Sequence, residues 1–438
     1  MSDLAEVEVV WYDCCVKSCL AFTGEHADLD HCVLCDEPRK DAHGKSCWCF
    51  GYIPLIPHLK GLYESEHMAN LMLYCHNFKA STTSISDVFN ANGYHQLLDR
   101  KVKVDGYKHD VALSVFVDTY TVFCRNHCGP SATLILIKNL NLPPKLHILS
   151  ENILPLGLIP GKPKDLGSYL HPYQEELVDL AHGVETYCAK CGLNITLHAY
   201  SHLTEGDICA IEAVLNLMGT SSFSPCRCCE IKEPRDLSLT RSPYYYPLRQ
   251  PQQNEDECQH HGCSSPHKWM HMFENIVPNL ILLWKGKFKG IHGDYEIDTD
   301  IWEQIGHETV NAIKDIPSAF VLYYYHACGL KNIMFTSIKF TITRVEIENL
   351  RKSIIKWVHE YERLYFHYDP KRLPVCTLTV HIIVHLPDNI LFCGPSWSTW
   401  TFWGERFCGL LQTQVSSHLA PFANLTNCLI YAAYVTQY

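Results

Sequence analysis

The sequence predicts an α/β protein with a buried sheet at its centre, and two apolar runs carry that prediction. Residues 111–117 are apolar except for Ser114. A run that is apolar on both faces is typical of a strand in the middle of a sheet that is covered on both sides. Residues 131–140 form a second such run, which ends before Pro143 and Pro144.

Amphipathic helices lie on both sides of these two runs in the sequence, and a further strand follows them. Residues 195–203 read as a strand, and residues 208–218 read as a helix with Asp207 at its N-cap position. Residues 50–78 begin with prolines and continue with helical periodicity, which predicts a connector helix. One helical face is predicted from Leu170, Tyr173, Leu177, Leu180, Ala181 and Val184. Another follows the capping-box pattern of Thr343 and Glu346 and consists of Ile347, Leu350, Ile354, Val358 and Tyr361.

Composition limits the class of protein. The 438 residues are 47% hydrophobic and 19% charged, which predicts two or three globular units. An acidic N-terminus and the lack of a run of about 18 apolar residues predict an intracellular chain without a membrane span. The net charge of −11 argues against nucleic-acid binding by bulk attraction, so any DNA contact must be local or assisted by metal ions.

The 23 cysteines and 26 histidines include short-spaced pairs, which in a reducing compartment indicate metal sites or buried thiols. The strongest pattern is Cys15 and Cys19 followed by Cys32 and Cys35. Each pair can present two thiolates to one tetrahedral zinc ion, and such a closed site would be structural. Cys14, Cys47 and Cys49 are spare or substitute ligands for this ion. The alternative is that the cysteines are buried free thiols.

Weaker metal signals lie further along the chain, each with a plainer alternative. Cys226 and Cys229 could form a second zinc site with the earlier pair Cys188 and Cys191. His381 and His385 are one helical turn apart and could be ligands, although histidines on an apolar segment are more often core residues. A local cluster of Cys258, His260, His261 and Cys263 could bind metal or be a polar loop.

One basic segment could contact nucleic acid. Lys285, Lys287 and Lys289 alternate beside Trp284 and Phe288, so that phosphate-binding charge could lie next to stacking surfaces. A solvated loop is the alternative.

Three carboxylates are candidates for a catalytic metal site. Asp118 ends the apolar run 111–117, at the rim of a sheet where chemistry is usually placed, although an Asp-Thr turn would also explain it. Asp207 can cap its helix and still face the Asp118 strand. Glu405 could be a surface residue paired with Arg406, or a carboxylate on a helix packed by aromatic residues, namely Trp397, Trp400, Phe402, Trp403 and Phe407.

An ordered set of motifs resembles the transposase of CACTA (En/Spm) DNA transposons, in the form common in fungal genomes. The resemblance covers roughly residues 10–425. Its motifs are 152–165 (NILPLGLIPGKPKD), 198–219 (HAYSHLTEGDICAIEAVLNLMG), 224–229 (SPCRCC), 271–275 (HMFEN), 283–290 (LWKGKFKG), 316–320 (IPSAF), 368–373 (YDPKRL), 378–381 (LTVH), 394–397 (GPSW) and 405–409 (ERFCG). The N-terminal cysteine segment and the Cys226 pair also match.

The resemblance implies a ribonuclease-H-like core that cleaves and transfers DNA strands. Asp118, Asp207 and Glu405 would hold two Mg²⁺ or Mn²⁺ ions, and zinc would be structural. Transposon ends and target DNA would be the partners, in the nucleus, and a homo-oligomer is possible. The expected organisation is a zinc-ribbon-like segment (1–50), a helical connector (51–105), the first part of the core (106–225), a mainly helical insertion (226–370) and the last part of the core with the closing acid helix (371–438).

Three departures from the family favour an alternative. The segment between Phe320 and Phe340 is short, Thr119 stands where the family has glycine, and Trp403-Gly404 stands where Pro-Met is usual. A shortened or domesticated copy would act without catalysis, as a DNA- or protein-binding module.

Overall fold

The chain forms two compact units. The computed structural model describes residues 7–99, 109–123, 129–217, 219, 222, 224–229, 231, 248, 269–297, 321–416 and 419–435. Unit 1 comprises Met1–Ala80, Tyr94–Leu217 and Thr401–Tyr438, and unit 2 comprises Ser81–Gly93 and Met218–Trp400. Residues 371–400, which we expected with the last part of the core, therefore lie in unit 2.

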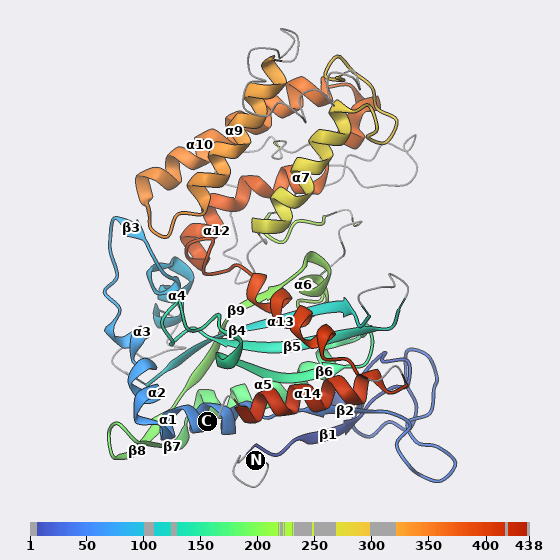
Figure 1. Cartoon of the computed structure of the whole chain (residues 1–438), viewed down its shortest axis with the longest axis vertical. Coiled ribbons are helices and arrows are strands. Elements are labelled where there is room, and N and C mark those ends of the chain that lie inside the picture. Colours follow the sequence, from blue (N-terminus) through green and yellow to red (C-terminus); the bar gives the residue numbers. More distant parts are fainter. Residues whose placement is uncertain are drawn as a thin grey trace. The chain divides into compact units, whose positions relative to one another are not determined.

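Unit 1 is built on a mixed sheet, which in the described part of the chain has six strands in the order β1-β2-β6-β5-β4-β9 (Figure 1). Neighbouring strands are antiparallel except β4 and β9, which are parallel. The strands are β1 (Val10–Asp13), β2 (Cys49–Tyr52), β6 (Ile153–Ile159), β5 (Ser131–Asn139), β4 (Val111–Thr121) and β9 (Ala199–Gly206).

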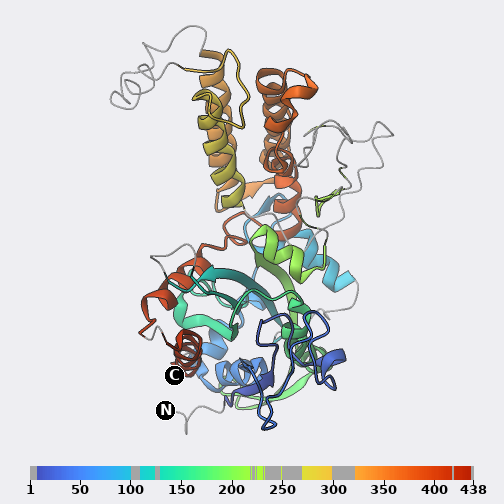
Figure 2. The same cartoon turned by 90° about the vertical axis from the view of Figure 1, so that its right-hand side faces the viewer.

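Helices cover both faces of this sheet, which explains the continuous apolar run of β4. Val111, Leu113, Val115 and Val117 share one core with residues of α1 (Leu55–Glu64) and α5 (Leu166–His182). Phe116 belongs to a second core with residues of α13 (Phe402–Thr413) and α14 (Pro421–Val435). Figure 2 shows the sheet of unit 1 from a second direction.

The remaining elements of unit 1 are short. The strand predicted at 195–203 is divided at His198 into β8 and β9, and the predicted connector is broken into short helices. These elements are α2 (Glu66–Leu71), α3 (Tyr74–Asn77), α4 (Asn92–Asp99, which crosses the boundary with unit 2), α6 (Ile208–Val214) and the hairpin of β7 (Val184–Cys188) and β8 (Leu193–Leu197).

Unit 2 is mainly helical in its described part. The predicted capping box is confirmed, because the Glu346 N–H donates to Thr343 Oγ1 (3.1 Å) and the Thr343 N–H donates to Glu346 Oε2 (2.8 Å). Its elements are α7 (Trp269–Trp284), α9 (Val321–Ser337), α10 (Arg344–Tyr361), α11 (Leu378–Ile382), α12 (Leu386–Cys393), and the pair β3 (Ser84–Ile85) and β10 (Ile342–Thr343). Within the ranges given above, no helix combines the length and hydropathy needed to cross a membrane.

Candidate functional site

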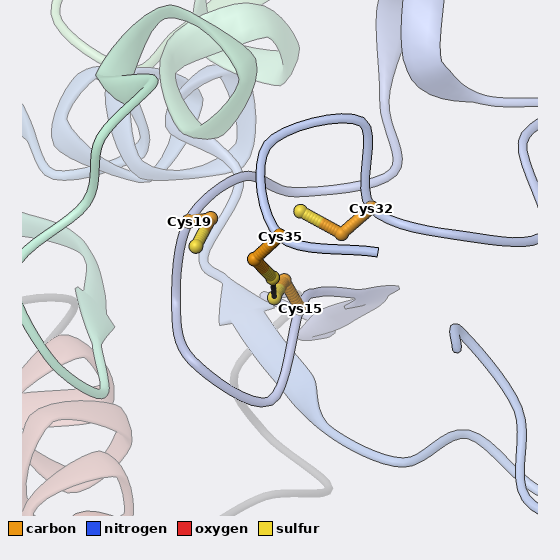
Figure 3. Close-up of side chains that lie close together, drawn as sticks. All are labelled: Cys15, Cys19, Cys32 and Cys35. Carbon is orange, nitrogen blue, oxygen red and sulfur yellow. Dashed lines mark hydrogen bonds between the residues drawn. The ribbon is translucent and has the colours of Figure 1, made fainter. Parts of the chain in front are cut away.

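Four thiols gather at the N-terminal end of unit 1, as the spacing predicts. The Sγ atoms of Cys15, Cys19, Cys32 and Cys35 all lie within 4.8 Å of one another (Figure 3). The Sγ atoms of Cys15 and Cys35 are 3.4 Å apart. Four sulfurs about 2.3 Å from one ion would be roughly 3.8 Å apart in a tetrahedron, so the cluster could bind a zinc ion.

Two tight turns present these thiols. Ser18 and Asp36 both have positive φ, at 56° and 60°, so that the chain reverses beside each pair of cysteines. The Asp36 N–H donates to the Cys32 carbonyl (2.8 Å), and the Lys17 N–H donates to Cys15 Sγ (3.4 Å). The first bond closes the turn between Cys32 and Cys35, and the second directs a backbone donor at a sulfur of the cluster.

The thiols differ in acidity because their surroundings differ. Burial, together with the neighbouring thiols, raises the pKa of Cys19 to about 12. Burial also acts to raise the pKa of Cys35, but hydrogen bonds from the Glu37 backbone and from neighbouring thiols lower it to about 7. Cys35 therefore ionises before Cys19.

A second cluster lies in unit 2 and joins two segments that are far apart in the sequence. Cys226 Sγ is 3.4 Å from His385 Nε2, and Cys229 Sγ is 3.2 Å from His381 Nε2. The two Nε2 atoms are 3.1 Å apart, and all four ligand atoms lie within 4.8 Å of one another. Two sulfurs and two imidazole nitrogens are a common ligand set for structural zinc.

Cys226 and Cys229 therefore lie beside His381 and His385, two candidate ligands of the sequence analysis, and not in one cluster with the pair Cys188 and Cys191. Cys188 and Cys191 belong to unit 1, where Cys191 Sγ lies 3.9 Å from His109 Nε2. The spacing of two residues in Cys226-x-x-Cys229 and three in His381-x-x-x-His385 was the signal that could have found the site. It was missed because the two halves are 152 residues apart. Cys258, His260, His261 and Cys263 lie outside the described residues.

Asp118 lies on β4, and Asp207 directly follows the neighbouring parallel strand β9. Val117 pairs with Gly206 in the β4–β9 register, and each aspartate is the residue after one member of that pair. Asp118 is not at the end of β4, which continues to Thr121, but it lies where β9 has ended. Asp207 is the N-cap of α6, as predicted, because its Oδ1 accepts from the Ala210 N–H (2.5 Å).

Glu405 lies in the first turn of α13, the helix that covers this part of β4. The Trp403 and Phe116 rings have centroids 5.1 Å apart, and Gln412 donates to the Thr121 carbonyl (2.6 Å). The residues of α13 that face the sheet are Trp403, Gly404, Phe407, Cys408 and Leu411, which are buried. Glu405 is half-buried and lies on the flank of that face.

The three acids do not form a single tight cluster of ligand atoms. Among the residues that the structure describes, the two groups of three or more His, Cys, Asp or Glu ligands within 4.8 Å are the cysteine cluster and the Cys/His cluster. A pair of ions about 4 Å apart does not require every carboxylate oxygen to meet at one point, because each ion takes its own subset.

The three lysines of the basic segment follow the end of α7 and are exposed. Lys285, Lys287 and Lys289 are thus accessible to phosphate. Phe288 is only 3% exposed, so its ring offers no stacking surface to a base.

No protein-family model matches the chain, and no curated protein matches it.

Proposed function

We propose that this chain is a CACTA-type transposase that cleaves and joins DNA strands, with Asp118, Asp207 and Glu405 as ligands of two divalent cations. The adjacency of Asp118 and Asp207 at the open end of a parallel strand pair is the observation that carries the proposal. Open α/β sheets bind ligands at the carboxyl ends of their strands.

Side-chain alternation supports the same conclusion. Residues two apart on a strand share a face, so Asp118 lies on the face of Phe116, which packs against Trp403 of α13. Phe116 pairs in parallel with Glu205, and the same alternation assigns Asp207 to that face. We therefore expect both aspartates to face the Glu405 helix, with Asp118 on that face of β4 and Asp207 directly after β9.

The topology supports a ribonuclease-H-like core. Strands β6, β5 and β4 are antiparallel neighbours, and β9 joins β4 in parallel after the helix α5. The helix α13, which carries Glu405, covers one face of this sheet. The strands β1 and β2, which flank the cysteine turns, extend the sheet beyond β6.

The donor set suits the proposed ions. Carboxylate oxygens are the ligands that Mg²⁺ and Mn²⁺ prefer. Asp207 caps α6 through its Oδ1, so its second carboxylate oxygen could bind an ion while the cap remains. Two such ions, when bound, would activate the attacking water or 3′-hydroxyl and stabilise the leaving oxygen. In this proposal the chain's own contribution is to present three carboxylates to the ions, one from β4, one from the junction of β9 and α6, and one from α13.

Zinc and DNA complete the proposal. We assign structural zinc ions to the cysteine cluster of unit 1 and the Cys/His cluster of unit 2, because four protein ligands leave no open position for chemistry.

DNA binding would depend on local contacts, because the net charge of the chain is −11. The exposed lysines at 285, 287 and 289 are candidates for these contacts. The substrate, transposon and target DNA, would place the protein in the nucleus.

A nicking assay on supercoiled plasmid with Mn²⁺ or Mg²⁺ tests the proposal. We expect the wild type to nick, and Asp207→Asn to bind plasmid without nicking, because asparagine still caps a helix but is a poor ligand for a divalent ion. Asp179→Asn is the matched control, since Asp179 is an exposed carboxylate of α5, which packs on the other face of the sheet. Isothermal titration with Mn²⁺ should show binding to the wild type and to Asp179→Asn but not to Asp207→Asn.

Two results would overturn the catalytic proposal. One is nicking by Asp207→Asn at the wild-type rate. The other is plasmid binding by both proteins with neither cutting under any divalent metal, which would favour the noncatalytic binding module.

A further inference from the structure

A buried polar cluster lies next to the rim acids, on the face of the sheet that α13 covers. It consists of Ser114, Lys138, Glu205 and Trp403. Glu205 Oε1 accepts from Lys138 Nζ (2.6 Å) and from Ser114 Oγ (2.7 Å), and Glu205 Oε2 accepts from Trp403 Nε1 (3.2 Å). Lys138 Nζ also lies 5.2 Å from the centroid of the Trp403 ring.

This cluster is placed where apolar residues would be expected. Lys138 is 0% exposed and Glu205 is 2% exposed. Their surroundings, including Phe116 and Leu136, belong to the apolar core of that face. Burying an ion pair costs more desolvation than its attraction returns unless the geometry is well satisfied, and well-packed apolar residues often serve stability better. The buried pair would be explained if it also held neighbouring elements of the fold in a fixed arrangement.

The cluster connects the three elements that carry the proposed metal ligands. Glu205 is two residues before Asp207 on β9, and Trp403 is two residues before Glu405 on α13. Phe116, two residues before Asp118 on β4, packs against Trp403. A Cβ added at Gly404 would lie 2.5 Å from the Phe116 ring, so α13 approaches β4 as closely as its backbone allows.

We infer that Glu205, neutralised by Lys138, is a positioning residue: through its bond to the Trp403 indole it fixes the first turn of α13, and hence Glu405, relative to Asp118 and Asp207. This inference rests on the proposed function. The Glu205–Trp403 hydrogen bond is a side-chain contact between the strand of the second acid and the helix of the third. Ser114, on the strand of the first acid, donates to the same carboxylate.

Two variants test the inference without exposing a buried charge. Trp403→Phe removes the indole N–H while keeping an aromatic ring, and Lys138→Met with Glu205→Leu replaces the whole ion pair by apolar side chains of similar size. We expect both to remain folded. Because a misplacement of about 1 Å at a catalytic group can reduce rate about a hundredfold, kcat for plasmid nicking should fall about tenfold to a hundredfold while KM for DNA is unchanged.

The readout that separates positioning from stability is Mn²⁺ affinity, measured by isothermal titration on the folded full chain. We expect Kd for Mn²⁺ to weaken about tenfold in both variants, by the same reasoning about supporting interactions around a metal site. Trp357→Phe is the matched control: Trp357 is equally buried, and its Nε1 donates to the His326 carbonyl (2.9 Å) in unit 2. It should lose a comparable bond and keep wild-type Mn²⁺ affinity and kcat.

The outcomes distinguish the two proposals. If the wild type binds Mn²⁺ and nicks DNA, but folded Trp403→Phe and the double variant match it in both measurements, the positioning role is refuted while the proposed function stands. A wild type that binds no Mn²⁺ overturns both. Variants that weaken Mn²⁺ binding and kcat together, with unchanged melting temperature, support the positioning role.

Discussion

Gly404 is the position at which the packing of α13 on the sheet can be tested most directly. A Cβ at this residue would lie 2.5, 2.6 and 2.7 Å from three carbons of the Phe116 ring. That ring is fully buried and packs against Trp403, so it has little room to move. We therefore expect Gly404→Ala to force α13 away from β4.

Two opposing effects set the change in the free energy of unfolding that Gly404→Ala should cause. Overpacking in a core costs about 1–3 kcal/mol, and three contacts this short put the cost at about 3 kcal/mol. Replacing glycine by alanine within a helix returns about 1 kcal/mol. We therefore expect Gly404→Ala to lower the free energy of unfolding by about 2 kcal/mol. For a unit of this size, that change lowers the melting temperature by roughly 4–8 °C.

Gly409 on the same helix is the matched control, because a Cβ there would meet nothing within 4 Å. Gly409→Ala should gain about 1 kcal/mol from helix propensity alone. Urea titration followed by circular dichroism, with hydrogen exchange of α13 to assign the transition to unit 1, should separate the two variants by about 3 kcal/mol. If Gly404→Ala proves as stable as Gly409→Ala, the close approach of α13 to β4 is refuted.

Two further predictions concern metal content and one capping box. The purified chain should hold two zinc ions, and Cys32→Ser and His385→Asn should each remove one, as measured by elemental analysis; loss of neither ion would contradict the proposed sites. The pKa of Glu346 is lowered to about 2, first by its hydrogen bond to Lys339 and then by its bonds to Thr343. A lowered carboxyl pKa contributes stability above its unfolded value of about 4.3 that is lost as pH falls toward 2. Glu346→Gln should therefore be less stable than wild type at pH 7 and approach it near pH 2 in thermal unfolding; a constant difference across this range would contradict the assignment.

Local patterns were sufficient to predict the elements whose determinants lie close together in the sequence. β4 was predicted because both of its faces are buried, and the N-caps at Asp207 and Thr343 because each cap bonds a backbone N–H three residues ahead. The four thiols of the cysteine cluster were predicted because each turn brings its own pair together.

The elements that were missed depend on distant partners. β6 contains Pro155 and Gly157, which argue against a strand, yet Pro155 lies where the β5–β6 register shifts, a position that tolerates the loss of a donor. β1 and β2 flank the cysteine turns, and their place beside β6 could not be predicted from those turns. The partners of Cys226 and Cys229 come from a segment 152 residues further along the chain.

That long separation gives the Cys/His cluster a role that the cysteine cluster does not share. A cross-link across 20 residues, as between Cys15 and Cys35, removes about 3 kcal/mol of unfolded-state entropy, whereas one across 152 residues removes about 5 kcal/mol in the chain-entropy treatment. Cys226 and Cys229 lie soon after residue 217, where the chain leaves unit 1, and His381 and His385 lie shortly before residue 401, where it returns. A zinc ion there would hold together the two ends of the long segment that forms most of unit 2. Removing it should loosen this segment, while the cysteine cluster, which closes only short loops, stabilises its own turns.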